Sequence, residues 1–321
     1  MKCLCCGKTI SDRASDVEKE WCWHKKCVKA FFQTEKLPFL DISKEQLEKL
    51  ANETVNEGLT VPGVQKKLSL HLSSDTSARL TIVDYPTGFI LKPQTDDFEN
   101  MPEFEDLAMR LAELMGIKTV PHALIRVNNE YAYITKRIDR GISQNETKLY
   151  AMEDFCQLSN RLTQDKYKGS YENCGRIVKK YSATPGLDLS ELFLRIIGSF
   201  VMGNSDMHLK NFSLKETESG SREFQLSKAY DMLPVNVIMP EDKEQFALTI
   251  NGKKRNIHRK EFKLLAESYG IPEKAAEHMI TKICALKEKM LQMVDNSYLT
   301  QEQKEKVREL ITERVEILHL K

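Results

Sequence analysis

The sequence contains no long apolar run and no excess of one charge. No stretch of about 18 apolar residues is present, so no membrane-spanning helix is predicted. The 48 Lys and Arg residues are balanced by 47 Asp and Glu residues, which gives no general electrostatic reason for nucleic-acid binding, and the basic cluster 253–255 is typical of a solvated turn. The chain opens on Lys2 and cysteines rather than on the apolar region of a secretory signal. We therefore expect a cytoplasmic protein whose substrate is a protein or a small molecule.

Linkers rich in glycine, serine or proline and internal repeats are absent too, so the domain boundaries have to be placed from motifs. A chain of 321 residues that is 41% hydrophobic can bury more than one core. We expect an α+β protein in three parts: a small metal-binding module over residues 1–35, an N-terminal lobe with a connecting helix over 36–150, and a helical lobe over 151–321.

Two common phosphate-binding motifs are missing. Neither G-x-x-x-x-G-K-[ST] nor G-x-G-x-x-G occurs. Present instead is a turn rich in small residues, 58–67, that runs into the alternating strand 68–72. This turn is either a phosphate-binding loop of another type or an ordinary hairpin turn.

The clearest chemical pattern lies in residues 203–214, which read G-N-S-D-M-H-L-K-N-F-S-L. They place Asp206 and Asn211 in a D-x4-N frame with Lys210 between them. In phosphoryl-transferring kinases an Asp accepts the proton of the attacking hydroxyl, and an Asn a few residues later holds Mg²⁺. Because Asp and Asn in a polar loop more often form caps or Asx turns, the frame is informative only together with its surroundings.

The surroundings favour the kinase interpretation. Apolar residues recur at helical spacing over 189–201, and a capping-box-like start at Asp188 predicts a buried helix that ends at Gly203. Asp231 follows the short strand that starts at Phe224, where a second metal-binding carboxylate is expected.

An apolar strand upstream, residues 88–93, carries a single lysine. Lys92 is a candidate ligand of the ATP phosphates, and an edge-strand lysine with its head in solvent is the alternative. Segment 103–115 has an apolar face at helical spacing and predicts a helix with a glutamate for this lysine. We favour Glu105 over Glu103 for this pairing.

Five of the eight cysteines lie in the first 27 residues. Cys3-x2-Cys6 and His24-x2-Cys27 are separated by seventeen residues, a spacing that indicates a structural Cys3His zinc site. Cys5 and Cys22 are spare candidates, and a group of reduced, partly buried cysteines is the alternative. A segment of about 30 residues buries too little apolar surface to fold without a stabilising metal site of this kind.

Six motifs occur in the order seen in the HipA family of bacterial Ser/Thr protein kinases, which are mostly toxins of type II toxin-antitoxin systems. They read T-V-P-G-V-Q-K-K, F-I-L-K-P, E-F-E-D-L-A-M-R-L-A, M-E-D-F-C-Q-L, G-N-S-D-M-H-L-K-N-F-S-L and A-Y-D-M-L-P. The resemblance covers residues 55–315. It implies a bilobal, protein-kinase-like α+β fold with a mainly helical C-lobe.

By this resemblance Asp206 is the catalytic base, supported by Lys92 and Glu105, while Asn211 and Asp231 hold Mg²⁺. The residues that it implies for the ATP site are Pro62, Gly63, Val64, Gln65, Lys66, Lys67, Lys92, Glu153, Asp154, Phe155, His208, Lys210, Asn211, Tyr230 and Asp231. Two of these assignments have simpler alternatives. The segment 152–157 can instead be a capped helix start with Phe155 in the core, and His208 can order the backbone of the loop.

Thr60 stands where members of this family carry an autophosphorylated serine. In the family that modification expels the phosphate-binding loop and switches the kinase off. A phosphate adds about two negative charges, which oppose ATP binding next to the nucleotide phosphates. Autophosphorylation of Thr60 and an unmodified turn residue both remain open.

Only about 55 residues precede the phosphate-binding turn, whereas full-length family members carry a longer N-terminal subdomain there. The chain resembles a short form in which the zinc module replaces part of that subdomain. We expect a separate helix-turn-helix antitoxin and a separate partner that resembles the missing subdomain.

The sequence thus predicts an ATP- and Mg²⁺-dependent Ser/Thr protein kinase with structural Zn²⁺, acting as a toxin on a cytoplasmic protein and on itself. The resemblance implies a target in the translation machinery, such as an aminoacyl-tRNA synthetase. A small-molecule phosphotransferase and a catalytically silent pseudokinase scaffold are the alternatives. The T-V-P-G-V-Q-K-K loop argues against the former, and the intact Lys92, Asp206, Asn211 and Asp231 argue against the latter.

Overall fold

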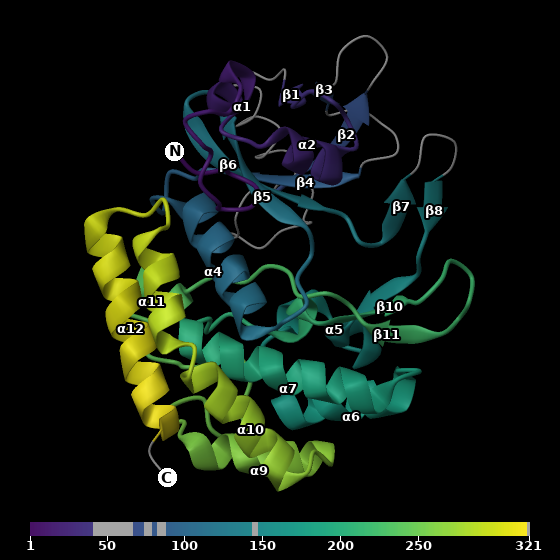
Figure 1. Ribbon diagram of the computed structural model, residues 1–321. Helices are drawn as coiled ribbons and strands as arrows, with labels where there is room; N and C mark the ends of the chain where they lie inside the picture. The colour runs from purple at the N-terminus through teal and green to yellow at the C-terminus, as the bar shows by residue number, and fades with distance from the viewer. Residues whose placement is uncertain (41–66, 74–78, 82–87, 143–146, 320–321) are drawn as a thin grey trace. The chain divides into compact units, whose positions relative to one another are not determined.

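The α+β architecture is divided between two units (Figure 1). The computed structural model describes residues 1–40, 67–73, 79–81, 88–142 and 147–319. Unit 1 comprises residues 1–106 and 120–147, and unit 2 comprises residues 107–119 and 148–321. Among the helices in the described ranges, none is both long enough and apolar enough to cross a bilayer.

Unit 1 is built on a six-stranded sheet in the order β1-β3-β2-β4-β6-β5. Its strands are β1 (Phe39–Leu40), β2 (Leu68–Ser73), β3 (Arg79–Thr81), β4 (Phe89–Pro93), β5 (His122–Val127) and β6 (Glu130–Lys136). β1 and β3 are parallel, whereas the other neighbours are antiparallel. The hairpin between β5 and β6 turns at Asn128 and Asn129, whose φ angles of 52° and 68° suit Asn and match the twist of the strands. The expected strands at 68–72 and 88–93 are therefore confirmed.

The cysteine-rich module packs on this sheet through aromatic rings. It contains α1 (Asp16–Trp21) and α2 (Lys25–Phe32). Phe31 and Phe32 of α2 lie 5.9 and 5.3 Å, between ring centroids, from Phe89 at the start of β4. The backbone N–H of Leu124 in β5 donates to Leu4 O at 3.1 Å, so the module also covers the edge strand. The module is thus part of the core of unit 1 rather than a tethered appendage.

Unit 2 is mainly helical, with a three-stranded antiparallel sheet β11-β10-β9. α4 (Met101–Met115) contains the division between the units, after Asp106. The remaining elements are β7 (Arg140–Ile142) in unit 1, β8 (Thr147–Leu149) at the division, and in unit 2 β9 (Met152–Asp154), α5 (Phe155–Leu158), the 3₁₀ turn η1 (Thr163–Asp165), α6 (Tyr171–Tyr181), α7 (Pro185–Met202), the 3₁₀ turn η2 (Leu209–Asn211), β10 (Ser213–Glu216), β11 (Phe224–Leu226), α8 (Val235–Ile238), α9 (Arg259–Tyr269), α10 (Glu273–Cys284), α11 (Lys287–Asp295) and α12 (Gln301–His319).

α7 is the central helix of unit 2, and it begins earlier than its sequence pattern indicated. The helix starts at Pro185 rather than at Asp188, because proline at the first helical position has the right φ and needs no hydrogen bond there. Asp188 lies inside the helix, buried, and accepts hydrogen bonds from Ser182 Oγ at 2.6 Å and Leu226 N at 2.7 Å. Its carboxylate therefore links α7 to β11 instead of capping the helix.

The C-terminus of α7 is confirmed at Gly203, which has φ 73°. The left-handed conformation stops the helix and sends the chain into the D-x4-N loop. A Cβ at this position would lie 2.2 Å from Leu310 Cδ2 of α12. Glycine is therefore favoured at position 203 for two reasons: it adopts the left-handed backbone conformation easily, and it has no Cβ to overlap with Leu310.

We expect Gly203→Ala to lower the free energy of unfolding by about 2–5 kcal/mol, the sum of left-handed strain and overlap with Leu310. Gly270→Ala is the control, because Gly270 also has positive φ but a Cβ there meets nothing within 4 Å. Chemical denaturation of both variants measures the difference. The double variant Gly203→Ala/Leu310→Ala should recover the overlap part of the loss, and equal losses in the two single variants would contradict the explanation.

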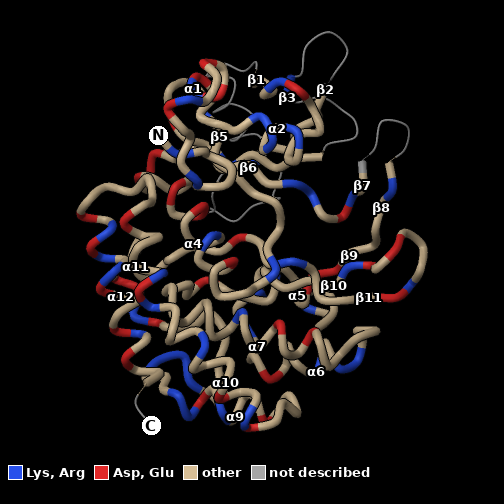
Figure 2. Tube along the Cα trace, in the orientation of Figure 1, with Lys and Arg blue, Asp and Glu red and all other residues tan. Residues whose placement is uncertain are grey.

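Positively and negatively charged residues are interspersed along α9 to α12 (Figure 2). Lys263 and Glu277 pair at 2.8 Å, and Lys306 and Glu302 pair at 2.7 Å. The basic cluster 253–255 lies in a turn where Lys253 and Lys254 pair with glutamates. This cluster is therefore partly neutralised and forms no basic stripe of the kind that binds nucleic acid.

Candidate functional site

The D-x4-N loop of unit 2 folds back on itself between α7 and β10. Asp206 O accepts hydrogen bonds from His208 N at 2.8 Å and from Asn211 Nδ2 at 3.1 Å. The side chains of Met207, Leu209 and Phe212 are fully buried and anchor the loop. The five-residue offset thus places the two polar residues on one turn, as two groups acting on the same phosphate require.

The Asp206 carboxylate is about half exposed, with 46% of its side-chain surface accessible. Tyr167 Oη donates a hydrogen bond to Asp206 Oδ1 at 2.7 Å, and His208 Nε2 lies 4.0 Å from Asp206 Oδ2. Burial, together with the nearby charge of Asp206, raises the pKa of Tyr167. The phenol therefore stays protonated and remains a donor at physiological pH. Sequence reasoning missed Tyr167, because it lies 39 residues before Asp206 and belongs to no motif.

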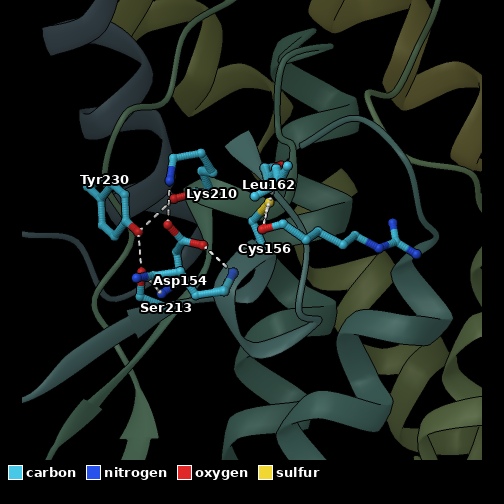
Figure 3. Close-up of polar contacts among 8 residues, drawn as sticks. Asp154, Cys156, Leu162, Lys210, Ser213 and Tyr230 are labelled. Atoms are coloured by element: carbon cyan, nitrogen blue, oxygen red, sulfur yellow. Dashed lines mark hydrogen bonds and ion pairs between the residues drawn. The ribbon is translucent and has the colours of Figure 1, made fainter. Parts of the chain in front are cut away.

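Tyr230 connects the segment before Asp231 to the same loop (Figure 3). Its hydroxyl donates to Lys210 O at 3.0 Å and lies 2.5 Å from Ser213 Oγ. Burial raises the pKa of Tyr230, so this hydroxyl also stays protonated. Asp231 has φ 59°, a left-handed conformation that Asp tolerates and that is often found at functional sites.

The segment 152–157, which includes three of the residues implied for the ATP site, begins a helix. Asp154 caps α5, where its Oδ1 accepts from Gln157 N at 2.9 Å and Gln157 Oε1 accepts from Asp154 N at 2.9 Å. Asp154 Oδ2 accepts from Lys210 Nζ at 2.7 Å, which ties β9 to the D-x4-N loop (Figure 3). Phe155 is fully buried against Phe212. The alternative of a capped helix start is therefore what the structure shows.

A role of this segment in nucleotide binding remains a prediction. The Asp154 carboxylate already serves as a cap and as the partner of Lys210. Glu153 lies exposed in β9. Any contact of Phe155 with a nucleotide would have to come from its backbone, because its side chain lies in the core.

In unit 1, Lys92 of β4 forms an ion pair with Glu105 of α4. Lys92 Nζ lies 2.5 Å from Glu105 Oε1, and the side chains are only 4% and 0% exposed. Lys92 Nζ also lies over the ring of Tyr133, 5.5 Å from its centroid. Lys92 is thus not a solvated edge-strand lysine.

Glu103 is not the partner of Lys92. Burial raises its pKa to about 7, so Glu103 is partly protonated near neutral pH. The choice of Glu105 over Glu103 is therefore confirmed as a contact. The nucleotide role of the pair stays a prediction.

The expected phosphate-binding turn lies almost entirely outside the described residues. Thr60, Pro62, Gly63, Val64, Gln65 and Lys66 lie outside the described residues. Lys67 is described and precedes β2.

The expected zinc ligands converge in unit 1. The ligand atoms of Cys3, Cys6, His24 and Cys27 all lie within 4.8 Å of one another. His24 Nδ1 is 3.4 Å from Cys6 Sγ and 3.8 Å from Cys27 Sγ. A tetrahedral zinc with Zn–S bonds of about 2.3 Å and Zn–N bonds of about 2.0 Å separates such atoms by about 3.5 Å. The donor set therefore fits a structural Zn²⁺.

The surroundings of the four ligands support this assignment. His24 Nε2 lies 3.4 Å from Thr9 O, a contact that leaves Nδ1 for the metal. The spare candidate Cys22 instead donates to Lys19 O at 3.6 Å. Burial, followed by the neighbouring thiols, raises the pKa of the Cys27 thiol.

We expect Cys6→Ser to lose its zinc and to lower the thermal stability of unit 1, because the module packs on β4 and β5. Cys5→Ser is the matched control and should retain the metal, since Cys5 is outside the four-ligand group. Elemental analysis and thermal unfolding of both variants give the result. Retention of zinc by Cys6→Ser would show that the ligand set is wrong.

A family model described as the HipA-like C-terminal domain matches residues 59–291. Two proteins of Sinorhizobium fredii, which are named as the kinases Y4mE and Y4dM, are each 29% identical to the chain over the aligned residues. The match to Y4mE covers 61% of this chain and 46% of the relative, and the match to Y4dM covers 67% and 54%. The aligned region thus spans about half the length of these curated relatives.

Two solved structures share the fold. The chain superimposes with a TM-score of 0.68 on a structure of the Shewanella oneidensis HipA, HipB and operator DNA complex, at 17% identity, covering 80% of this chain and 63% of the other. It superimposes with a TM-score of 0.54 on the Helicobacter pylori proinflammatory kinase CtkA, at 14% identity, covering 78% and 93%. The expected kinase-like α+β fold is therefore confirmed. Because the family model spans most of the sequence, the chain belongs to the HipA-like C-terminal domain family.

Proposed function

We propose that the protein is an ATP- and Mg²⁺-dependent Ser/Thr protein kinase. The observation that carries this proposal is the buried pair of Lys92 and Glu105. Burying two charges costs more free energy than their attraction usually returns, so such a pair is weak support for a purely structural role. In kinases a strand lysine that is paired with a helix glutamate binds the ATP phosphates. A role in nucleotide binding therefore explains why this chain keeps the two charges buried.

The D-x4-N loop supplies the remaining chemistry. Asp206 accepts the proton of the acceptor hydroxyl, and its partly exposed carboxylate leaves room for that hydroxyl. With Asn211 Nδ2 on Asp206 O, the amide oxygen of Asn211 is the end that would ligate Mg²⁺. Asp231 would supply the second oxygen ligand. When bound, Mg²⁺ neutralises charge on the ATP phosphates.

We also propose a toxin role with two separate partners, a helix-turn-helix antitoxin and a protein that resembles the N-terminal subdomain. The support is the fold shared with a HipA that was solved with HipB and operator DNA. The match covers 63% of the chain in that structure. Copurification of the products of neighbouring genes tests this, and a protein that binds none of them would contradict it.

The direct test of the kinase proposal is incubation with Mg²⁺ and γ-labelled ATP, in parallel with a cell proteome and with a metabolite extract. We expect label on Ser or Thr of proteins, including Thr60 of the enzyme itself, identified by mass spectrometry. Label confined to metabolites would indicate a small-molecule phosphotransferase. The absence of both labelling and ATP binding would indicate a scaffold.

A further inference from the structure

The Asp206 carboxylate is held by a tyrosine from outside its own loop. Tyr167 Oη donates to Asp206 Oδ1 at 2.7 Å, while the Tyr167 ring packs edge-on against His208, 5.1 Å between centroids. A short hydrogen bond to a charged oxygen restricts rotation of the carboxylate and is stronger than a neutral one. Tyr167 therefore contacts both the proton acceptor and a neighbouring side chain of the D-x4-N loop.

The backbone on both sides of Tyr167 is fixed. Leu209 N of the D-x4-N loop donates to Lys166 O at 3.2 Å, and Thr249 N donates to Gly169 O at 3.2 Å. Gly169 has φ 151°, and a Cβ there would lie 3.1 Å from Arg161 Nη1. Backbone hydrogen bonds thus join the segment around Tyr167 to the D-x4-N loop at Leu209 and to Thr249. These bonds restrict the backbone that carries the Tyr167 side chain.

A second tyrosine supports the next residue of the same loop. Tyr171 Oη donates to Met207 O at 3.1 Å, and Tyr269 Oη donates to Tyr171 O at 2.6 Å. Tyr171 is fully buried. Successive loop residues, 206 and 207, are therefore held by tyrosines four residues apart, as expected for a preorganised site.

Several charged or titratable groups surround this contact. Asp242 accepts from Ser205 Oγ at 2.9 Å, and its charge contributes to the raised pKa of Tyr167. Lys166 Nζ lies over the Tyr167 ring, 4.9 Å from its centroid. His208 Nε2 faces Asp206 Oδ2 at 4.0 Å. The hydrogen bond from the phenol to Oδ1, at 2.7 Å, is much shorter than the 4.0 Å contact of His208 with Oδ2.

We propose that Tyr167 is a positioning residue that fixes the orientation of the Asp206 carboxylate through its hydrogen bond to Oδ1. This inference rests on the proposed kinase function. Because the phenol stays protonated, it donates throughout the working pH range and does not compete as a base.

The test is Tyr167→Phe, which keeps the ring over His208 and removes only the hydroxyl. Tyr181→Phe is the matched control, because Tyr181 is similarly exposed and has Lys180 Nζ 4.7 Å from its ring centroid. We expect kcat of Tyr167→Phe to fall about 10- to 100-fold, as for loss of a hydrogen bond to a charged group. The KM for ATP should not change. The acid limb of the pH–rate profile should move to higher pH, because the carboxylate loses a donor that favours its charged form.

Two kinetic outcomes overturn the proposal. An unchanged kcat and acid limb would show that the hydroxyl positions nothing. A raised rate would show that the phenol occupies the acceptor position and blocks it. An unfolded variant is excluded in advance by thermal melting against Tyr181→Phe.

A measurement independent of activity separates this proposal from the kinase proposal. Aspartate labelled with ¹³C at the carboxyl carbon is titrated by NMR in the wild type and in Tyr167→Phe, and Asp206→Asn identifies the signal. We expect the midpoint of the Asp206 signal to rise in Tyr167→Phe. An unchanged midpoint overturns the positioning role whether or not the wild type transfers phosphate, whereas a wild type without transfer overturns only the kinase function.

Discussion

Asp206→Asn should lower phosphoryl transfer by about 10²- to 10⁴-fold while the protein stays folded. The asparagine has the same shape as aspartate, and its amide oxygen can still accept the hydrogen bond from Tyr167 Oη. It cannot accept the proton of the acceptor hydroxyl. Transfer from γ-labelled ATP measures the rate, and thermal unfolding reports on the fold.

Asp165→Asn is the control for this prediction. Asp165 lies in η1, two residues before Tyr167, and pairs with Lys168 at 2.6 Å. Because the Lys168 side chain is 75% exposed, loss of this pair should have little effect on stability. We expect near wild-type transfer in Asp165→Asn. Equal rates in the wild type and Asp206→Asn would remove Asp206 as the base.

Disruption of the buried pair in unit 1 should have the largest effect on stability. Glu105→Ala leaves the Lys92 ammonium buried without its carboxylate, and we expect a loss of about 3–5 kcal/mol in the free energy of unfolding. The apolar double variant Lys92→Met/Glu105→Leu removes both charges and should recover most of that loss. It should nevertheless be inactive, because the lysine that holds the ATP phosphates is gone.

The exposed pair Lys306 and Glu302 of α12 serves as the comparison. Its atoms are 2.7 Å apart, but the side chains are 53% and 77% exposed. We expect Glu302→Ala to cost only a few tenths of a kcal/mol. Urea denaturation of all variants, combined with transfer assays, separates stability from catalysis. Full activity in the apolar double variant would contradict the nucleotide role of the Lys92 and Glu105 pair.

Local patterns predicted the elements that follow from neighbouring residues alone. The left-handed end of α7 at Gly203 was predictable because turn chemistry is set within a few residues. The predicted start of α7 at Asp188 is wrong, because Pro185 begins the helix and the Asp188 side chain bonds to Ser182 and to Leu226, 38 residues away, instead of capping it.

The same distinction holds at the candidate site. The offset between Asp206 and Asn211 lies within one short loop and is visible in the chain. The contact of Tyr167 with Asp206 joins segments that only folding brings together. Asp154 shows a third case, because its motif predicted a nucleotide contact while its carboxylate caps α5 and pairs with Lys210.

By itself the sequence determined the family, the order of the motifs, the zinc ligand spacing and the D-x4-N loop, because each depends on residues close along the chain. Only the tertiary structure decided that Glu105 rather than Glu103 pairs with Lys92, that Cys5 and Cys22 stand outside the metal group, and that Tyr167 holds Asp206. The physical reason is that burial and side-chain partners arise between segments far apart in sequence. Their energies depend on three-dimensional distance and solvent exclusion, which no periodicity or spacing encodes.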